Sequence, residues 1–86
     1  MATIFRRVRV ADYERFREVY EAGTPDREAG GFHDEQLFRN PKDPNDILIM
    51  TTVADIDRAR AYGQSEEVRE RQRAAGLLEL SNYYPE

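Results

Sequence analysis

The chain has 86 residues, with 13 basic and 17 acidic side chains and a formal net charge of −4 at pH 7. A chain of this length suits one domain, residues 1–86, which buries only about 60 to 65% of its unfolded surface, so a partner chain would help its stability. With no basic block, no cysteine and no long apolar run, the sequence argues against nucleic-acid binding, disulfides, thiolate chemistry, a signal peptide and a membrane span, and it fits a cytoplasmic protein.

The first expected element is a strand over residues 3–10, because apolar and polar residues alternate there and several are β-branched. One face would carry Ile4, Arg6, Val8 and Val10, and the other Thr3, Phe5, Arg7 and Arg9. A helix should follow to about residue 22, since Asp12 can cap it and aromatic residues recur at helical spacing. Thr24 and Pro25 then predict a short helical turn that ends before Gly30.

A hairpin is expected next, with strands over residues 31–39 and 47–53. Strict alternation in the first strand places Phe32, Asp34, Gln36 and Phe38 on one face and His33, Glu35, Leu37 and Arg39 on the other. The second strand is apolar on both sides, which is typical of a strand with both faces covered. The prolines in 40–46 should keep both strands out of this turn.

Two helices and a strand complete the chain. Asp55 should cap a helix that carries Ile56, Ala59 and Tyr62 on its apolar side, and Ser65 should cap another that ends at Gly76. Residues 77–84 alternate as a final strand. The order predicts an α+β fold, the ferredoxin-like βαββαβ arrangement with a four-stranded antiparallel sheet and helices on one face.

The two-sided apolar pattern of residues 47–53 has a consequence for assembly. Helices can cover only one face of this sheet, while Leu48 and Met50 would face the other side. An exposed apolar sheet face is most simply covered by a second copy. We therefore expect a homodimer formed through the sheet face.

Five segments together resemble the antibiotic biosynthesis monooxygenase-like proteins of the dimeric α+β barrel group. They are VADYERF at 10–16, EAGG at 28–31, FRN at 38–40, DPN at 43–45, and ARAY at 59–62 leading to Ser65. The similarity spans nearly the whole chain. It implies a dimer whose sheets face each other, with a small-molecule pocket between sheet and helices in each subunit.

The same family includes cofactor-free oxygenases, haem-degrading enzymes and polyketide cyclases. The haem-degrading relatives use a tryptophan, which this chain lacks, so the resemblance argues against haem. Some relatives carry a histidine in the first strand where this chain has Val8, so catalysis built on that position is not expected here. No glycine-rich phosphate loop, nucleophile elbow or flavin or nicotinamide fingerprint is present, and we expect no cofactor.

Three residues are candidates for catalysis. His33 is the one side chain whose ordinary pKa suits a general base near neutral pH, although a lone histidine beside Asp34 and Glu35 is more often a surface residue. It has no second ligand at metal-binding spacing, so no metal site is expected. Arg6 and Arg7 could hold an enolate or phenolate, or they could pair with Glu35, Glu79 or a partner subunit.

Aromatic and apolar residues could line a ligand pocket. The substrate-binding candidates are Phe16, Tyr20, Phe38, Met50, Tyr62 and Tyr83, with Tyr84 as an alternative to Tyr83. Most of these rings should belong to the core, but a buried hydroxyl needs a partner and could offer a hydrogen bond to a ligand. Such a pocket suits a flat aromatic or polyketide-like molecule.

The leading interpretation is a small homodimer that binds such a metabolite and oxygenates it without a cofactor. His33 or bound water would remove a proton, and an arginine and a tyrosine would stabilise the carbanion before it reacts with oxygen. A second interpretation keeps the base without oxygen, giving cyclisation or isomerisation. A third is a non-catalytic ligand-binding or dimerisation module.

Overall fold

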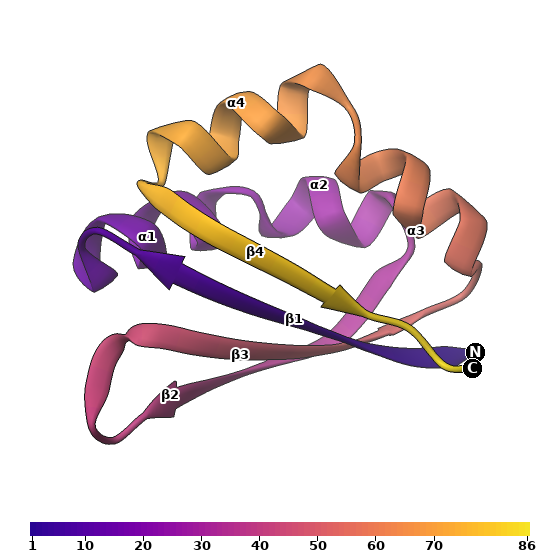
Figure 1. Ribbon diagram of the computed structural model, residues 1–86. Helices are drawn as coiled ribbons and strands as arrows, with labels where there is room; N and C mark the ends of the chain where they lie inside the picture. The colour runs from indigo at the N-terminus through magenta and orange to yellow at the C-terminus, as the bar shows by residue number, and fades with distance from the viewer.

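An antiparallel sheet forms one layer of the molecule, and the helices lie on one face of it (Figure 1). The computed structural model describes residues 1–86, and its strands are ordered β2-β3-β1-β4. The elements are β1 (Ala2–Val10), α1 (Tyr13–Ala22), α2 (Thr24–Ala29), β2 (Phe32–Asn40), β3 (Asp43–Val53), α3 (Ile56–Gly63), α4 (Glu66–Ala74) and β4 (Leu77–Tyr83). The predicted α+β, ferredoxin-like fold is confirmed. The two chain ends lie at the end of the sheet opposite α1 (Figure 1).

The helices begin where their capping residues predict. Asp12, Asp55 and Ser65 accept hydrogen bonds from first-turn backbone N–H groups at 3.0, 3.2 and 3.3 Å. Each cap of this kind contributes about 0.5–2 kcal/mol. Gly76 follows α4 with a φ of 75°, a left-handed conformation that glycine adopts at little cost.

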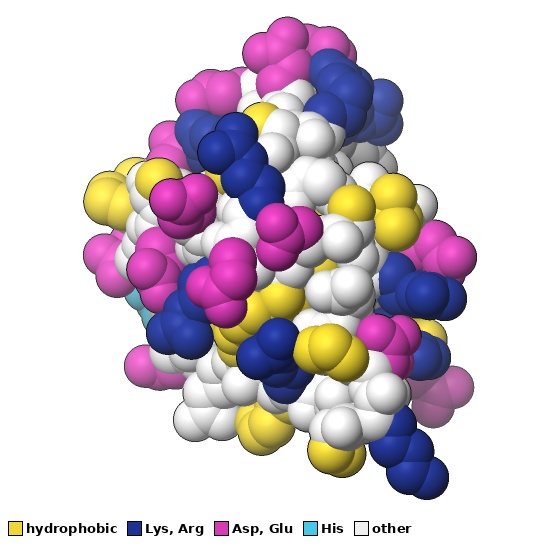
Figure 2. Space-filling view, turned by 90° about the vertical axis from the view of Figure 1, so that its left-hand side faces the viewer, with side chains coloured by type: hydrophobic (Ala, Val, Ile, Leu, Met, Phe, Trp, Pro, Cys, Tyr) yellow, Lys and Arg dark blue, Asp and Glu magenta, His cyan; other side chains and the backbone are white.

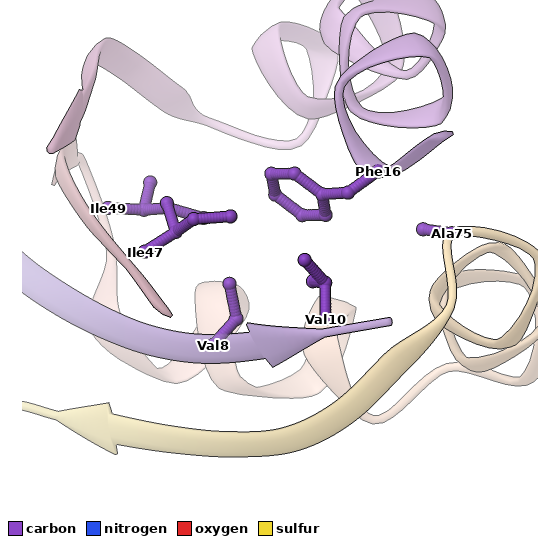
Figure 3. Close-up of a cluster of buried hydrophobic side chains, with 6 residues drawn as sticks. All are labelled: Val8, Val10, Phe16, Ile47, Ile49 and Ala75. Carbon is purple, nitrogen blue, oxygen red and sulfur yellow. The ribbon is translucent and has the colours of Figure 1, made fainter. Parts of the chain in front are cut away.

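The helix-covered face of the sheet holds two apolar clusters. The first consists of Val8, Val10, Phe16, Ile47, Ile49 and Ala75 (Figure 3). The second consists of Ile4, Phe32, Val53 and Ala59. Arg6 of β1 and Thr51 of β3 each lie between residues of the two clusters along their strands. The face predicted for Ile4, Arg6, Val8 and Val10 is thus confirmed, and polar side chains divide the core.

The other side of the sheet carries no helix, and we call it the open face. Leu48 there is 36% exposed, while its neighbour Ile49, on the helix side, is only 2% exposed, so the two-sided pattern of β3 is confirmed. Phe5, Phe38 and Tyr83 are also exposed on this face. This face therefore exposes apolar side chains beside the charged Arg7 and Arg9.

Charged side chains of both signs are interspersed at the end of the molecule formed by α1 and the β2–β3 turn (Figure 2). Apolar atoms lie between them, and neither sign of charge dominates this view. None of the helices is both long enough and apolar enough to cross a membrane.

The turn between β2 and β3 is tighter than the sequence predicts. The expectation that Pro41 and Pro44 exclude both strands from 40–46 is wrong, because β2 runs through Asn40 and β3 begins at Asp43. The pairing register shifts at Asn40, which places Pro44 in a bulge. Pro44 also lies beyond the residues of β3 that pair with β1, so no ladder hydrogen bond needs its missing N–H.

A second bulge lies inside β2. His33 pairs with Thr52 of β3 and Gln36 pairs with Met50. Asp34 and Glu35 therefore lie together opposite a single residue, Thr51. Asp34 has a φ of 53°, a left-handed conformation that Asp tolerates better than most residues. The extra residue shifts the alternation by one position.

This bulge corrects the faces predicted for β2. Phe32 and Phe38 were expected on the same face, but Phe32 is 3% exposed among the helix-side residues and Phe38 is 47% exposed on the open face. Glu35 and Leu37 instead share the helix side with Phe32, as their contacts with Arg27 and with the first apolar cluster establish. Strict alternation failed because one strand carries one more residue than its partner.

The bulge can be tested at Asp34. Asp34→Val should lower the free energy of unfolding by about 1 to 2 kcal/mol, because a β-branched residue resists the left-handed conformation. Asp34→Gly should leave it unchanged or raise it by up to about 1 kcal/mol. Urea unfolding of both variants measures this difference, and equal stability of Val and Gly would contradict the bulge geometry.

Candidate functional site

A pair of adjoining cavities lies between the sheet and the helices, the first lined by residues of all four helices and the second by residues of α3 and α4. Their volumes are about 70 and 90 Å³. The residues that line both are Arg6, Tyr62, Val68, Gln72 and Leu80. No residue of α4 itself is buried, so this helix covers the cavities without packing tightly into the core.

Three charged side chains form a cluster beside the first cavity. Glu35 accepts a hydrogen bond from Arg6 Nη2 at 2.8 Å and another from Arg27 Nε at 2.7 Å, each to a different carboxylate oxygen. The Arg6, Glu35 and Arg27 side chains are 18%, 12% and 9% exposed. Charges this far from water need partners, and here one carboxylate serves two guanidinium groups.

Tyr20 of α1 completes this part of the cavity wall. The guanidinium carbon of Arg27 lies 3.7 Å from the centre of the Tyr20 ring, and Arg27 also donates to Thr24 Oγ1 at 3.1 Å. Burial, followed by the negative charge of Glu35, raises the pKa of Tyr20 well above its ordinary value. The hydroxyl is therefore protonated at neutral pH and available as a donor.

A second polar network ties three helices together at the rim of the cavities. Asp26 of α2 accepts from the Tyr62 hydroxyl of α3 at 2.6 Å and from Arg71 Nη1 of α4 at 2.8 Å. Hydrogen bonds from Tyr62 and then Arg71 lower the pKa of Asp26, which keeps it ionised. Arg71 also bonds to Glu67 within α4. This network holds α4 over the cavities.

The structure brings some of the predicted site residues together on the helix side. Arg6, Phe16, Tyr20 and Tyr62 line the first cavity. Arg6 forms the ion pair with Glu35 that the sequence offered as one alternative. Tyr84, rather than Tyr83, lines the second cavity.

The remaining predicted residues lie on the open face. His33 is exposed there, and its backbone carbonyl accepts a hydrogen bond from Thr51 Oγ1 at 3.0 Å. Phe38 and Tyr83 are 47% and 55% exposed, and Met50 faces the same way because it alternates with Ile49. A catalytic role of His33 stays a prediction, and it would require the substrate to bind on the open face.

Arg7 also lies on the open face and is held by an acidic partner. Its Nε and Nη2 donate to the two oxygens of Asp46 at 3.0 and 2.8 Å, and Asn40 donates to Asp46 at 3.0 Å. These bonds, first from Arg7 and then from Asn40, lower the pKa of Asp46 to about 2. Arg6 and Arg7 are consecutive in β1, so their side chains lie on opposite faces of the sheet.

Sequence reasoning missed Arg27 as a site residue, as well as the rim formed by Asp26 and Arg71. Arg27 lies in a six-residue helix whose position over the sheet no local pattern indicates. Glu35 was considered as a pairing partner, but it was assigned to the face opposite Phe32. No three acidic, histidine or cysteine side chains are grouped so that they could hold a metal ion.

Comparison with known proteins finds chains of similar structure. No family model and no curated protein sequence matches this chain. A crystal structure of an antibiotic biosynthesis monooxygenase superposes with a TM-score of 0.75 at 11% identity, covering 100% of this chain and 97% of the other. The cofactor-independent oxygenase SnoaB from Streptomyces nogalater gives 0.74 at 18%, covering 99% and 92%.

A provisionally assigned antibiotic biosynthesis monooxygenase from Caulobacter crescentus CB15 gives a TM-score of 0.71 at 14% identity, with 98% of this chain and 88% of the other covered. At these identities the comparisons establish a shared fold. The resemblance noted from the sequence is confirmed at that level, over essentially the full chain.

The Arg7–Asp46 pair makes stability depend on pH. The folded-state pKa of Asp46 is about 2, below an unfolded value of about 3.9, so its contribution is complete above about pH 4 and is lost as the pH falls towards 2. Asp46→Asn should flatten the fall in unfolding free energy over this interval. Urea unfolding at several pH values tests this, with Glu70→Gln on the exposed surface of α4 as the control. Identical pH profiles for wild type and Asp46→Asn would contradict it.

Proposed function

We propose that this chain is a cofactor-independent monooxygenase that acts on an aromatic or polyketide-like molecule in the cavities beneath α3 and α4. The observation that carries the proposal is an arginine, Arg6, lining an apolar cavity together with Tyr20 and Tyr62. The shared fold with SnoaB, a cofactor-independent oxygenase, supports the same activity.

The proposed reaction uses electrons from the substrate. Loss of a proton from an activated CH₂ group gives a carbanion, which reacts with O₂; overall, CH₂ and O₂ become C=O and H₂O. Arg6 would stabilise the anion in surroundings of low polarity, where a positive charge acts strongly. Because His33 lies on the open face, water bound in the cavity is the better placed proton acceptor.

The cavity volumes limit the substrate. Pockets for drug-sized ligands measure about 300–1,000 Å³, and these two cavities are smaller. A single-ring compound suits the structure as it stands. A polycyclic compound would require α4 to move outward. Such a movement would expose little apolar surface, because no residue of α4 is buried.

The protein further acts as a homodimer in this proposal. The open face exposes Phe5, Phe38, Leu48 and Tyr83, and contiguous apolar surface of this kind commonly marks an interface. Pairing two open faces would cover these side chains and would also enclose His33 and Arg7. A non-catalytic dimerisation module would share this feature, so activity has to be measured separately.

Oxygen consumption with a compound that carries an activated CH₂ group, such as anthrone, tests the activity. Arg6→Gln should lower kcat by about a hundredfold, because it removes the charge that stabilises the anion. Arg9→Gln is the matched control, since Arg9 lies in the same strand with its side chain half exposed on the open face. Equal losses in both variants, or no oxygen uptake by the wild type with any such compound, would contradict the proposal.

His33→Ala locates the chemistry. If the reaction takes place in the cavities, its kcat should stay within about threefold of wild type, well under the effect of losing a general base. A loss of about a hundredfold together with loss of the corresponding limb of the pH–rate profile would instead place the base at His33 on the open face.

Sedimentation velocity at micromolar concentration tests the dimer. The wild type should sediment as a dimer, and Leu48→Asp should sediment as a folded monomer, because it places a charge in the apolar interface. Leu78→Asp provides the control, since Leu78 is 66% exposed at the edge beside α4. A wild-type monomer would rule out the sheet-face dimer.

A further inference from the structure

The cluster around Glu35 carries an uncompensated positive charge. Arg6 and Arg27 contribute two guanidinium groups and Glu35 one carboxylate, and no other acidic side chain bonds to either arginine. Each oxygen of Glu35 already accepts one of these bonds. Because all three side chains are largely shielded from water, the excess charge is costly until an anion joins the cluster.

Two polar atoms beside this charge lack hydrogen-bond partners. Arg6 Nε and the Tyr20 hydroxyl oxygen are both buried, and neither lies within hydrogen-bonding geometry of a protein group, although Glu35 is close enough to raise the pKa of Tyr20. Buried donors in native proteins are nearly always satisfied, so each such group calls for an explanation. Both residues line the first cavity, where a ligand could reach them.

Arg6 also connects the two cavities. It lines both of them, and its guanidinium carbon lies 5.6 Å from the centre of the Phe32 ring. The second cavity adds the rings of Phe32 and Tyr84 to that of Tyr62, which lines both cavities. A ligand that spans the cavities would therefore have a charged end near Tyr20 and a ring near Phe32.

We propose that the cavities bind a small aromatic carboxylate, whose oxygens accept from Arg6 Nε and the Tyr20 hydroxyl while its ring enters the second cavity. Arg27 is a positioning residue that orients Glu35 and Tyr20. This inference rests on the proposed function because it names the substrate class of the same site. The carboxylate is the group that the protein binds, and the oxidised carbon lies elsewhere in the substrate.

Benzoate is the probe, and benzamide, which is neutral and of nearly the same shape, is its control. Titration followed by amide NMR, carried out without oxygen, should show benzoate binding with shifts at Arg6, Tyr20 and Phe32, and benzamide binding at least about tenfold more weakly. Phenol, present at a pH where it is neutral, distinguishes recognition of a carboxylate from recognition of a hydroxyl. Benzamide or phenol binding as tightly as benzoate would overturn the inference.

Tyr20→Phe tests the second donor without endangering the fold, because the hydroxyl it removes has no partner in the protein. It should weaken benzoate binding by about tenfold or more, the usual value of a hydrogen bond to a charged group. Tyr13→Phe is the control, since the Tyr13 hydroxyl accepts from Arg17 on the surface of α1. Unchanged affinity in Tyr20→Phe would overturn the assignment of this donor and with it the proposed site.

The two proposals fail separately. Benzoate binding that depends on Tyr20, in a protein that consumes no oxygen, would retain the anion site and reject the oxygenase. Oxygen uptake with anthrone, which carries no carboxylate, in a protein that does not distinguish benzoate from benzamide, would retain the oxygenase and reject the anion site.

Discussion

The arrangement of the helix side depends on one carboxylate. Glu35 of β2 bonds to Arg6 of β1, although these two strands are not neighbours in the sheet. It also bonds to Arg27 and so ties the sheet to α2. Removing Glu35 would leave two arginines charged and unpaired, and breaking a buried ion pair in this way commonly costs about 3–5 kcal/mol. The same polar group separates the two apolar clusters and forms a wall of the first cavity. Structure and candidate function therefore share one set of side chains.

Glu35 reaches this position because of the bulge at Asp34. Without the extra residue, strict alternation would turn either Phe32 or Glu35 away from the helices. With it, Phe32 fills the second apolar cluster and Glu35 still faces Arg6. His33 lies on the open face because it directly follows Phe32, and the bulge after it places Glu35 on the opposite face from His33. A single backbone irregularity thus separates a possible histidine base from the carboxylate that bonds to Arg6.

Much of the fold could be predicted from the sequence because its signals are local. Capping at Asp12, Asp55 and Ser65 and the alternation of β1 depend on residues a few positions apart, and the structure has them as expected. Bulges are different. Whether Asp34 takes a left-handed conformation, or Pro44 lies inside β3, depends on how one strand registers against another. The position of Arg27 depends on how α2 lies over the sheet, so one of the three members of the charged cluster could not be recognised from local patterns.

Local stability should differ between α4, which has no buried residue, and β3, whose apolar residues are almost completely buried. Ile47, Ile49 and Val53 of the central strand are almost completely buried, so their amides exchange only when the whole domain unfolds. No residue of α4 is buried, and its ties to α2 and α3 are the partly exposed bonds of Arg71. We therefore expect α4 to open at a lower free energy than β3 does. Substitutions along α4 would then alter how fast a ligand enters and leaves while the melting temperature hardly changes, so this segment is free to diverge in sequence without loss of the fold.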